Sequence, residues 1–483
     1  MTMRRRGART RLPAWPAAAL ALCTQACTFL QPDYVRPETA LPEKFEHAVE
    51  PAVPQNLAEP PSGWWHLLGS AELDGLIVRA LENNHDIRAA VHRIAQAKAQ
   101  AGIAAGPLLP KLGIGASAQG DSPTGGITAK TRSPDGKSER SYQATLSASY
   151  EIDLWGLNRS NEDAAIATLQ ASSYDREALA LTLVAEVAST YLQYLLACDR
   201  VAVAEKNVAS MQQVLDVVQK RHRVGEGARL EVMQQKTALA QARASVPALE
   251  LVREQSRDLL ATLVGEIPEG FTVKTGSLSA LTLPSLPTAL PSSLLERRPD
   301  IRRAEASLVA ANAQIGAARA GLLPSFDLTA QRGVGSYYLN NLFNPASYLY
   351  VLAGNMAATL FDNGRNLSAI DFNQALFAER AELYRQTVLD ALRDVEDSLA
   401  AIRSSERTES AQIEAFENAS AALQMSREAF SMGTSDYLTV LDTERTLYQS
   451  DDAKAQARFD RLNAAVSLFR SLAGTTYGAA NEG

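Results

Sequence analysis

The pattern of apolar and polar positions is dominated by two very long helices. Residues 157–224 and 365–432 contain neither glycine nor proline and are rich in Ala, Leu, Glu, Gln and Arg, all strong helix formers. In the second stretch apolar residues recur at steps of three and four, which is coiled-coil spacing. These residues are Phe377, Ala381, Tyr384, Val388, Leu392, Val395, Leu399 and Ile402. A straight helix of this length measures roughly 100 Å, far more than a compact domain needs.

Each long helix is expected to fold back on a shorter partner. The helices predicted are residues 157–225 with 229–264, and residues 365–432 with 435–473. Gly225, Gly227 and Gly433 lie between the partners, where glycine commonly ends a helix. Pro247 is expected to interrupt the helix over 229–264, because proline lacks the backbone donor of a helix interior.

Alternating polarity predicts four β-strands. They cover residues 111–120, 141–152, 325–335 and 347–360, and a polar loop separates the members of each pair. In the second strand Tyr142, Leu146 and Tyr150 share one face. Strands of about ten alternating residues are typical of tilted strands in an outer membrane. A soluble hairpin is the alternative for each pair.

The chain contains two copies of one unit. Residues 86–110 match residues 300–324 without a gap, and both segments end in Leu-Leu-Pro. The pattern Gly225-x4-Leu230 recurs as Gly433-x4-Leu438, and each half closes with Leu-x3-Leu-x-Gly. The divisions expected are a signal peptide (1–26), an extended N-terminal segment (27–63), the first repeat (64–273), a proline-dotted linker (274–293), the second repeat (294–474) and a C-terminal tail (475–483).

Four strands are too few to close a membrane barrel, since the smallest such barrels have about eight. An open sheet in lipid leaves backbone groups unpaired at both edges. The barrel is therefore expected to be shared between chains, with eight strands from two copies or twelve from three. An eight-stranded barrel is filled by side chains, so a conduit favours twelve strands and a trimer.

The N-terminus has the three parts of an export signal. Five arginines within residues 4–11 precede the short apolar run 12–22, and Ala26 then precedes Cys27. That run is too short to span a membrane, and no other stretch is expected to form a transmembrane helix. Cleavage before Cys27 followed by its acylation is the interpretation preferred here.

Two alternatives to acylation at Cys27 stay open. One is an ordinary signal peptide with an incidental cysteine. The other is cleavage before Cys23, which has Leu20 three residues earlier where Cys27 has Thr24. Leu22 is a poor cleavage neighbour for Cys23, which favours Cys27. Cys198 is expected to be a buried structural thiol.

Composition excludes several classes of function. The 483 residues are 46% hydrophobic and 21% charged, which is typical of a folded protein. The net charge of −7 provides no broad basic surface for nucleic acid. His85 and His92 lack further metal ligands, and no nucleophile–base pair or phosphate loop is apparent. The chain is therefore expected to be no enzyme and to bind no cofactor or metal other than the lipid on Cys27.

Several motifs resemble the TolC-like outer membrane factor family, and specifically its NodT/OprM-like lipoprotein branch, which serves resistance-nodulation-division (RND) efflux pumps. Cys27 precedes a Pro32-x-Tyr34-x-Arg36-Pro37 run, and Trp64-Trp65 opens the first repeat. Glu151-Ile-Asp153-Leu-Trp155-Gly156 follows the second strand, and Leu360-Phe361-Asp362-Asn-Gly364 is its counterpart. The resemblance covers essentially the whole mature chain.

The resemblance implies a mainly α-helical membrane protein: a homotrimer that shares a twelve-stranded β-barrel and continues into a periplasmic coiled-coil tunnel, closed at its tip. It places the periplasmic gate just after the hairpin glycine. Asp442, nine residues after Gly433, matches one gate aspartate, but the other gate position is Thr439. Glu231 is the equivalent of Thr439 in the first repeat, and Phe430 stands where relatives can carry a gate tyrosine.

The resemblance further implies that the protein, held in the outer membrane by its lipid anchor, exports small molecules such as drugs from the periplasm or an inner-membrane pump to the exterior. A periplasmic adaptor protein would meet the hairpin tips, residues 222–235 and 430–445, and an inner-membrane RND pump would load the tunnel. Two other functions stay open: a structural coiled-coil lipoprotein that spans the envelope, and an outer-membrane duct for protein secretion.

Overall fold

The computed structural model describes residues 30–39, 41–47, 63–121, 139–285 and 294–472. The predicted signal peptide, the acylation site Cys27 and the tail 475–483 lie outside these residues. The chain forms two compact units that share its long helices. Unit 1 comprises residues 1–37, 94–171 and 304–384, and unit 2 comprises residues 38–93, 172–303 and 385–483.

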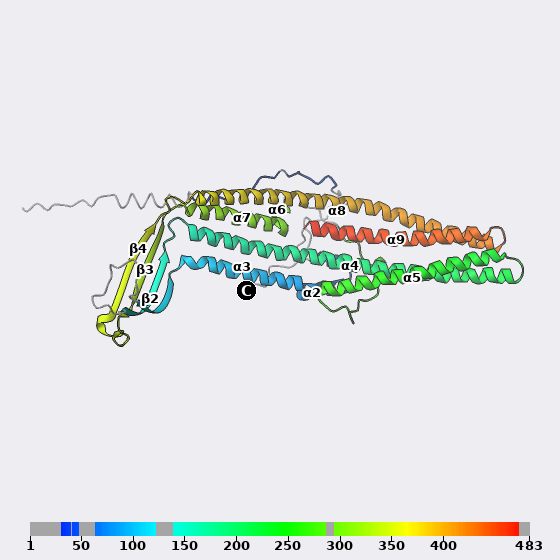
Figure 1. Cartoon of the computed structure of the whole chain (residues 1–483). Helices are drawn as coiled ribbons and strands as arrows, with labels where there is room; N and C mark the ends of the chain where they lie inside the picture. Colours follow the sequence, from blue (N-terminus) through cyan, green and yellow to red (C-terminus); the bar gives the residue numbers. More distant parts are fainter. Residues whose placement is uncertain (1–29, 40, 48–62, 122–138, 286–293, 473–483) are drawn as a thin grey trace, which may run out of the picture. The chain divides into compact units, whose positions relative to one another are not determined.

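The described chain is mainly helical with one antiparallel sheet, and its elements follow the same order in both halves (Figure 1). The helices are α2 (Ala71–Asn83), α3 (His85–Ala105), α4 (Leu157–Arg223), α5 (Arg229–Val264), α6 (Leu294–Arg297), α7 (Pro299–Ala320), α8 (Arg365–Ser431) and α9 (Tyr437–Ser471). The strands are β1 (Lys111–Asp121), β2 (Glu139–Glu151), β3 (Ser325–Ser336) and β4 (Tyr348–Ala357). Short 3-10 turns include Trp64–Leu68, Gly106–Leu108, Leu278–Ala280, Leu339–Asn341 and Pro345–Ser347.

The helix and strand ends lie within a few residues of the predicted ends, with one difference. α5 runs unbroken through Pro247, so the prediction that this proline interrupts the helix is wrong. Buried residues on both sides of the proline, Leu239 and Ala242 before it and Leu260 after it, hold α5 against its neighbours. Tertiary packing therefore outweighs the lost backbone hydrogen bond.

The prediction that no transmembrane-length apolar helix follows the N-terminus also needs correction. One stretch of α4 is long and apolar enough to cross a membrane by length and composition, with a mean hydropathy of 1.4. About two-thirds of that stretch, 67%, is buried in the structure. Val184, Leu192 and Leu195 of α4 belong to the core of unit 2, so packing inside the protein explains this apolar stretch.

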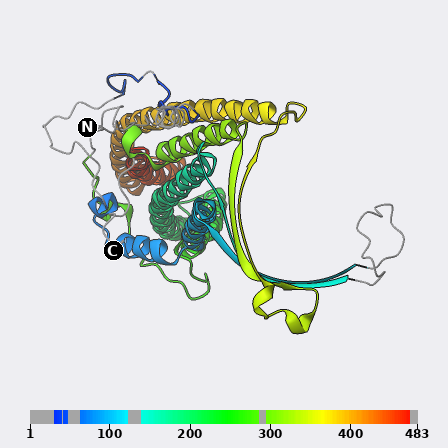
Figure 2. The same cartoon turned by 90° about the vertical axis from the view of Figure 1, so that its left-hand side faces the viewer.

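The sheet of unit 1 has the strand order β1-β2-β3-β4 and appears as a curved layer in Figure 2. Its register pairs Ile114 with Leu146, Leu146 with Arg332, and Arg332 with Tyr350. Even-numbered residues therefore share one face, which is mostly apolar, and odd-numbered residues share the other. The odd face carries mainly Gly, Ser, Thr and Gln.

Two aspartates start the long helices where the chain leaves the sheet. The Asp153 carboxylate accepts a hydrogen bond from the Arg159 backbone N–H (2.8 Å) at the start of α4. The Asp362 carboxylate accepts one from the Asn366 backbone N–H (2.9 Å) at the start of α8. Such caps satisfy backbone donors that a helix leaves unpaired. The Glu-x-Asp-Leu-Trp-Gly element and its counterpart thus have a structural role.

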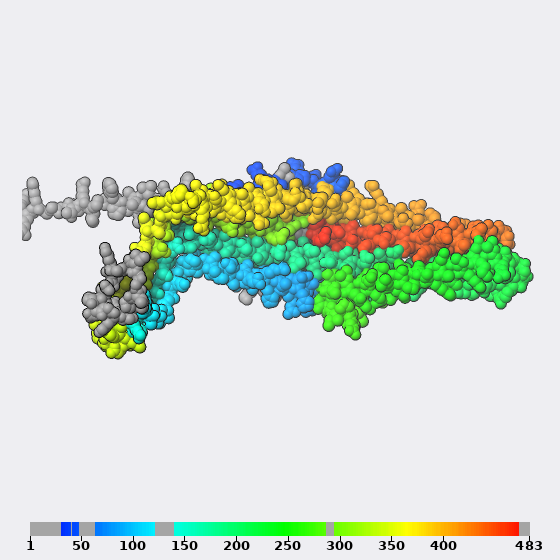
Figure 3. All heavy atoms as spheres, in the orientation of Figure 1, coloured from blue at the N-terminus to red at the C-terminus, as the bar shows by residue number. Residues whose placement is uncertain are grey.

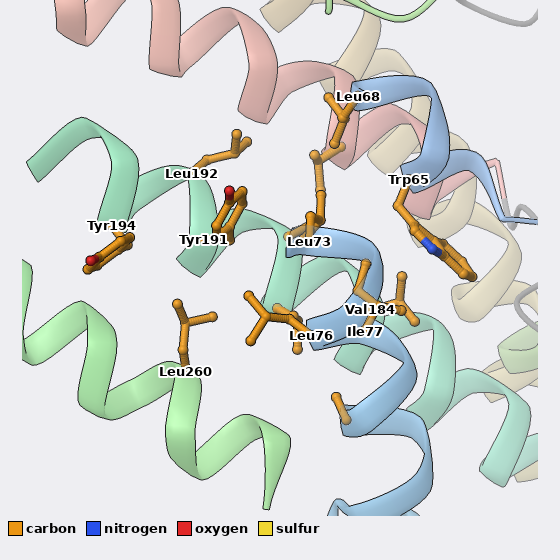
Figure 4. Packing of buried hydrophobic residues seen from close by; sticks show 14 of the residues in the cluster. Trp65, Leu68, Leu73, Leu76, Ile77, Val184, Tyr191, Leu192, Tyr194 and Leu260 are labelled. Carbon is orange, nitrogen blue, oxygen red and sulfur yellow. The ribbon is translucent and has the colours of Figure 1, made fainter. Parts of the chain in front are cut away.

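The core of unit 2 packs α2 against α4 and α5. Figure 4 shows Leu76 and Ile77 of α2 among Val184 and Leu192 of α4 and Leu260 of α5. Trp64, which is fully buried, stacks on Phe469 of α9 with ring centroids 5.2 Å apart. This cluster thereby joins the start of the first half to the last helix of the second.

Candidate functional site

The residues predicted to form a gate lie at the tip of unit 2, where the α4–α5 turn and the α8–α9 turn lie side by side (Figures 1 and 3). Each turn ends its long helix in the same way. Gly225 and Gly433 adopt left-handed φ values of 83° and 76°. The next residue donates its backbone N–H to the carbonyl five residues earlier, Glu226 to Arg221 (3.0 Å) and Thr434 to Ala429 (2.9 Å). Both turns are therefore Schellman caps, which favour glycine at that position.

Two of the four predicted gate residues, Asp442 and Thr439, are exposed on α9. Thr439 belongs to the helix cap: its hydroxyl and its backbone N–H both donate to the Asp436 carboxylate, at 2.6 and 2.8 Å. These hydrogen bonds hold the pKa of Asp436 below its ordinary value. The tip therefore carries a carboxylate at Asp436, three residues before Thr439, and sequence reasoning missed it.

The other two, Phe430 and Glu231, are less exposed. Phe430 is buried beneath the Arg221 guanidinium, which lies 4.6 Å from its ring centroid, and it meets the Tyr437 ring edge-on at 6.3 Å. Glu231 is half-buried in the first turn of α5, where the helix dipole favours a negative charge. The structure thus brings Phe430 and Glu231 toward Tyr437, while Asp442 and Thr439 stay on the surface of the unit.

A buried ion pair at the tip was not predicted. Arg427 of α8 contacts Glu444 of α9, with Nη2 and Oε1 2.6 Å apart. The Glu444 side chain is 2% exposed and that of Arg427 is 40% exposed. Ser210 of α4 contacts both partners, since it donates to Glu444 Oε1 (3.1 Å) and accepts from Arg427. The contacts join three helices through one carboxylate.

A second polar contact, between Gln235 and Tyr437, crosses the tip. Gln235 of α5 is fully buried and donates from Nε2 to the Met211 carbonyl of α4 at 2.7 Å. Its Oε1 accepts a hydrogen bond from the Tyr437 hydroxyl of α9. Burial, together with the charges of Glu444 and Glu231, raises the pKa of Tyr437 to about 12. We refer to Ser210, Gln235, Arg427, Tyr437 and Glu444 as the tip network.

No group of three or more potential metal ligands occurs in the described ranges. The tip network consists of an ion pair, an amide and two hydroxyl groups, and it includes no paired nucleophile and base. The arrangement is suited to holding helices together or letting them part, rather than to bond chemistry.

Comparison with known proteins identifies the family. The sequence model of the outer membrane efflux protein family matches residues 76–266 and 290–474. The pyoverdine export outer membrane protein OpmQ of Pseudomonas aeruginosa is 39% identical over 414 residues, which are 85% of this chain and 87% of OpmQ. The cation efflux system protein CusC of Escherichia coli K12 is 29% identical over 466 residues, 96% of this chain and 98% of CusC.

Solved structures agree with the sequence matches. The outer-membrane channel OprN superposes with a TM-score of 0.86 at 28% identity, covering 92% of this chain and 98% of OprN. The open state of the Neisseria gonorrhoeae MtrE outer membrane channel gives 0.82 at 29% identity, with coverage of 92% and 98%. These are channels rather than enzymes, which confirms the prediction that the chain is no enzyme. The chain belongs to the outer membrane efflux protein family.

Proposed function

We propose that this protein is the outer-membrane channel of a tripartite efflux system that exports small molecules. The proposal rests mainly on the sheet of unit 1, which has one apolar and one polar face. Among the described residues, its edge strands β1 and β4 each pair with a strand on one side only. Three copies would join these edges into a twelve-stranded barrel, with the apolar face toward lipid and the polar face toward a lumen. Two internal repeats, each with two strands and a helical hairpin, would build the protomer.

The partners follow from this role. A periplasmic adaptor protein would contact the hairpin tips, and an inner-membrane pump of the RND type would load the tunnel. OpmQ, by its name, exports pyoverdine and CusC belongs to a cation efflux system, so relatives of similar architecture differ in cargo. We therefore assign substrate choice to the partners.

The exposed carboxylate of Asp442 is the gate residue we propose, with Glu231, Thr439 and Phe430 shaping the tip behind it. Three symmetry-related Asp442 side chains would form an acidic ring that narrows the opening and favours cations there. Asp442 makes no hydrogen bond or ion pair through its carboxylate in the described part of the protomer, so the group is available to a neighbouring copy.

Single-channel conductance in planar bilayers tests the channel and the gate together. Wild type is expected to give discrete steps, and Asp442→Ala steps that are larger or longer-lived. Glu417→Ala removes an exposed carboxylate of α8 and serves as the matched control, which should behave as wild type. Inserted trimers that never conduct in any variant would contradict the channel, and the envelope-scaffold alternative would then be preferred.

Lipid attachment at Cys27 has a separate test. Cells fed radioactive palmitate should label wild type and the Cys23→Ala and Cys198→Ala variants, but not Cys27→Ala. Loss of label in Cys23→Ala instead would move the acylation site to that residue, and label in no variant would favour an ordinary signal peptide.

A further inference from the structure

Arg332 of β3 stands on the apolar face of the sheet. Its register partners on that face are Leu146 of β2 and Tyr350 of β4. Large apolar and aromatic side chains surround it on all four strands and are strongly exposed within the chain. They include Ile114 (89%), Tyr350 (86%), Leu352 (81%), Leu112 (72%), Met356 (66%) and Tyr348 (65%). A guanidinium in such surroundings needs an explanation.

Among the strand residues whose side chains the structure describes, the apolar face offers Arg332 no carboxylate. The acidic ones, Glu151 and Asp327, have odd numbers and belong to the other face. Arg332 makes no hydrogen bond or ion pair among the residues that the structure describes, and its side chain is exposed. A lone charge among apolar side chains calls for a partner from outside the chain.

The position of Arg332 along its strand indicates where that partner lies. Arg332 is four residues from Ser336, the end of β3 that leads into the β3–β4 connection, and seven from Ser325 at the helix side. Four residues span about 13 Å along a strand, and a tilt of about 40° reduces this to about 10 Å of depth. The flexible stem of an arginine can then carry its guanidinium toward the membrane surface.

The neighbours of Arg332 suit a lipid headgroup. Tyr350 lies directly opposite, and Tyr348 and Tyr142 lie nearer the connection ends of β4 and β2. Tyrosine is enriched at the depth where acyl chains meet headgroups. An arginine fork binds phosphate oxygens through charge-assisted hydrogen bonds. We propose that Arg332, with its register partner Tyr350, binds the phosphate of an anionic lipid in the outer leaflet of the membrane.

This inference rests on the proposed function, in which the apolar face meets lipid. A neighbouring copy of the chain is a poor alternative partner for the arginine. Neighbouring copies would join at β1 and β4, whereas Arg332 stands on the inner strand β3. Arg140, on the same face near the connection end of β2, adds a second positive charge at the membrane surface.

Lipid retention in nanodiscs provides the test. Wild type, Arg332→Leu and Lys111→Gln are reconstituted in phosphatidylcholine doped with diphosphoryl lipid A, and the lipid A retained per protomer after washing is measured by native mass spectrometry. Lys111 is the matched control, since it is a cation of the same sheet on the polar face. We expect Arg332→Leu to bind lipid A about tenfold more weakly, the change that one charge-assisted hydrogen bond supports, and Lys111→Gln to match wild type.

Thermal unfolding midpoints add a second readout, in which Arg332→Leu should not be impaired although its lipid retention falls. In phosphatidylcholine alone, Arg332→Leu should be at least as stable as wild type, because the substitution removes an unpaired charge from the lipid-facing side of the sheet. Adding lipid A should raise the thermal midpoint of wild type only. Equal retention by wild type and Arg332→Leu, or an equal loss in Lys111→Gln, would overturn the proposal. So would displacement of lipid A from wild type by inorganic phosphate, because the site would then bind the free ion.

Conductance separates the two hypotheses. Arg332→Leu channels that conduct as wild type but retain as much lipid A would refute the lipid site and leave the channel intact. A wild type that inserts in no bilayer would instead refute the proposed function.

Discussion

Arg427 and Glu444 form an asymmetric ion pair at the helical tip, because the carboxylate is almost fully buried while the guanidinium is 40% exposed. Glu444 Oε2 and Arg427 Nε have no hydrogen-bond partner in the described chain. The pair is therefore held by a single charged contact and by Ser210 of α4. Removing Arg427 would leave a buried carboxylate without its cation, whereas removing Glu444 would leave a partly exposed guanidinium.

The asymmetry predicts unequal costs for removing the two partners. Arg427→Ala leaves a buried carboxylate without a cation, which should cost about 3–5 kcal/mol of local stability. Glu444→Gln leaves a guanidinium that water can reach and an amide that still accepts a hydrogen bond, so the loss of local stability should be only about 1 kcal/mol. Hydrogen exchange of the backbone amides around Gly433 measures both costs.

Arg461→Ala is the matched control for Arg427→Ala. Arg461 contacts the buried carboxylate of Glu409 at 2.6 Å, but Arg458 contacts the same carboxylate at 3.3 Å. Glu409 therefore keeps a cation in this variant, and exchange near Gly433 should be unchanged. Equal protection factors in Arg427→Ala and Glu444→Gln would contradict the asymmetry.

Tyr437 makes the tip sensitive to high pH. Its pKa is about 12 in the folded protein against 10 for an ordinary tyrosine, so the folded state holds the phenolic proton more tightly. The resulting stabilisation is complete below pH 10 and is lost as pH rises from about 10 to about 12. Burial also raises the pKa of Tyr191 and Tyr384, so the measurement is the difference in tyrosinate absorbance between wild type and Tyr437→Phe, which should develop between about pH 10 and about pH 12.

Tyr437→Phe should also destabilise the tip at neutral pH. The substitution leaves the buried Gln235 Oε1 without its donor, at a cost of about 1–3 kcal/mol. A Tyr437→Phe/Gln235→Leu double variant should recover part of that cost, since no polar group is then left unpaired. A double variant as unstable as the sum of its single changes would show that the hydrogen bond contributes little.

The helices and strands could be predicted because their signals are local: glycine and proline mark element ends, and alternating apolar and polar residues mark strands. Gly225 and Gly433 end α4 and α8 through backbone geometry alone, and the period-two pattern around Leu146 defines a strand face. Pro247 misled the prediction because the packing that keeps α5 continuous comes from residues distant in sequence.

The tip network was missed although a signal was present. Tyr437, Val440, Glu444 and Leu447 follow steps of three and four, as do Val232, Gln235, Leu239 and Ala242. A polar residue at an apolar position of such a stripe predicts a buried polar contact. Its partners could not be predicted, because Arg427 and Ser210 reach Glu444 from helices whose neighbours only the fold determines.

Arg298 and Asn84 are 214 residues apart, which is the offset between the two sequence copies. Each donates a hydrogen bond to a carbonyl near the end of the last helix of its repeat, α5 for Asn84 and α9 for Arg298. Asn84 donates to the Leu263 carbonyl of α5 at 2.9 Å, and Arg298 donates to the Ser471 carbonyl of α9 at 3.2 Å. Arg298 also contacts Asp300 at 2.7 Å and Asp394 at 3.2 Å. Burial opposes the charge of Arg298, but these carboxylates raise its pKa overall.

Arg298→Met should therefore destabilise unit 2 by about 1–3 kcal/mol, since Asp300 loses its cation and the Ser471 carbonyl loses its side-chain donor, while Asp394 keeps Arg393 at 3.5 Å. Arg298→Lys should recover only part of this, because an ammonium cannot contact both carboxylates and the carbonyl in the same geometry. Asn84→Ala removes a helix cap and should cost about 1–2 kcal/mol. Urea unfolding followed by tryptophan fluorescence compares the three variants, and full rescue by lysine would contradict a role for the planar fork.

Glu151 and Asp327 lie directly opposite each other on the polar face of the sheet, in the β2–β3 register. Like charges directly opposite each other destabilise a sheet. In the proposed barrel both carboxylates would line the lumen, which gives a reason for their presence. Glu151→Gln should stabilise the sheet by about 0.2–1 kcal/mol and lower the preference for cations. Reversal potentials across a KCl gradient measure the preference. Gln331→Glu, which adds a carboxylate to the same face, should raise it, and reversal potentials that neither variant shifts would place this face outside the conducting path.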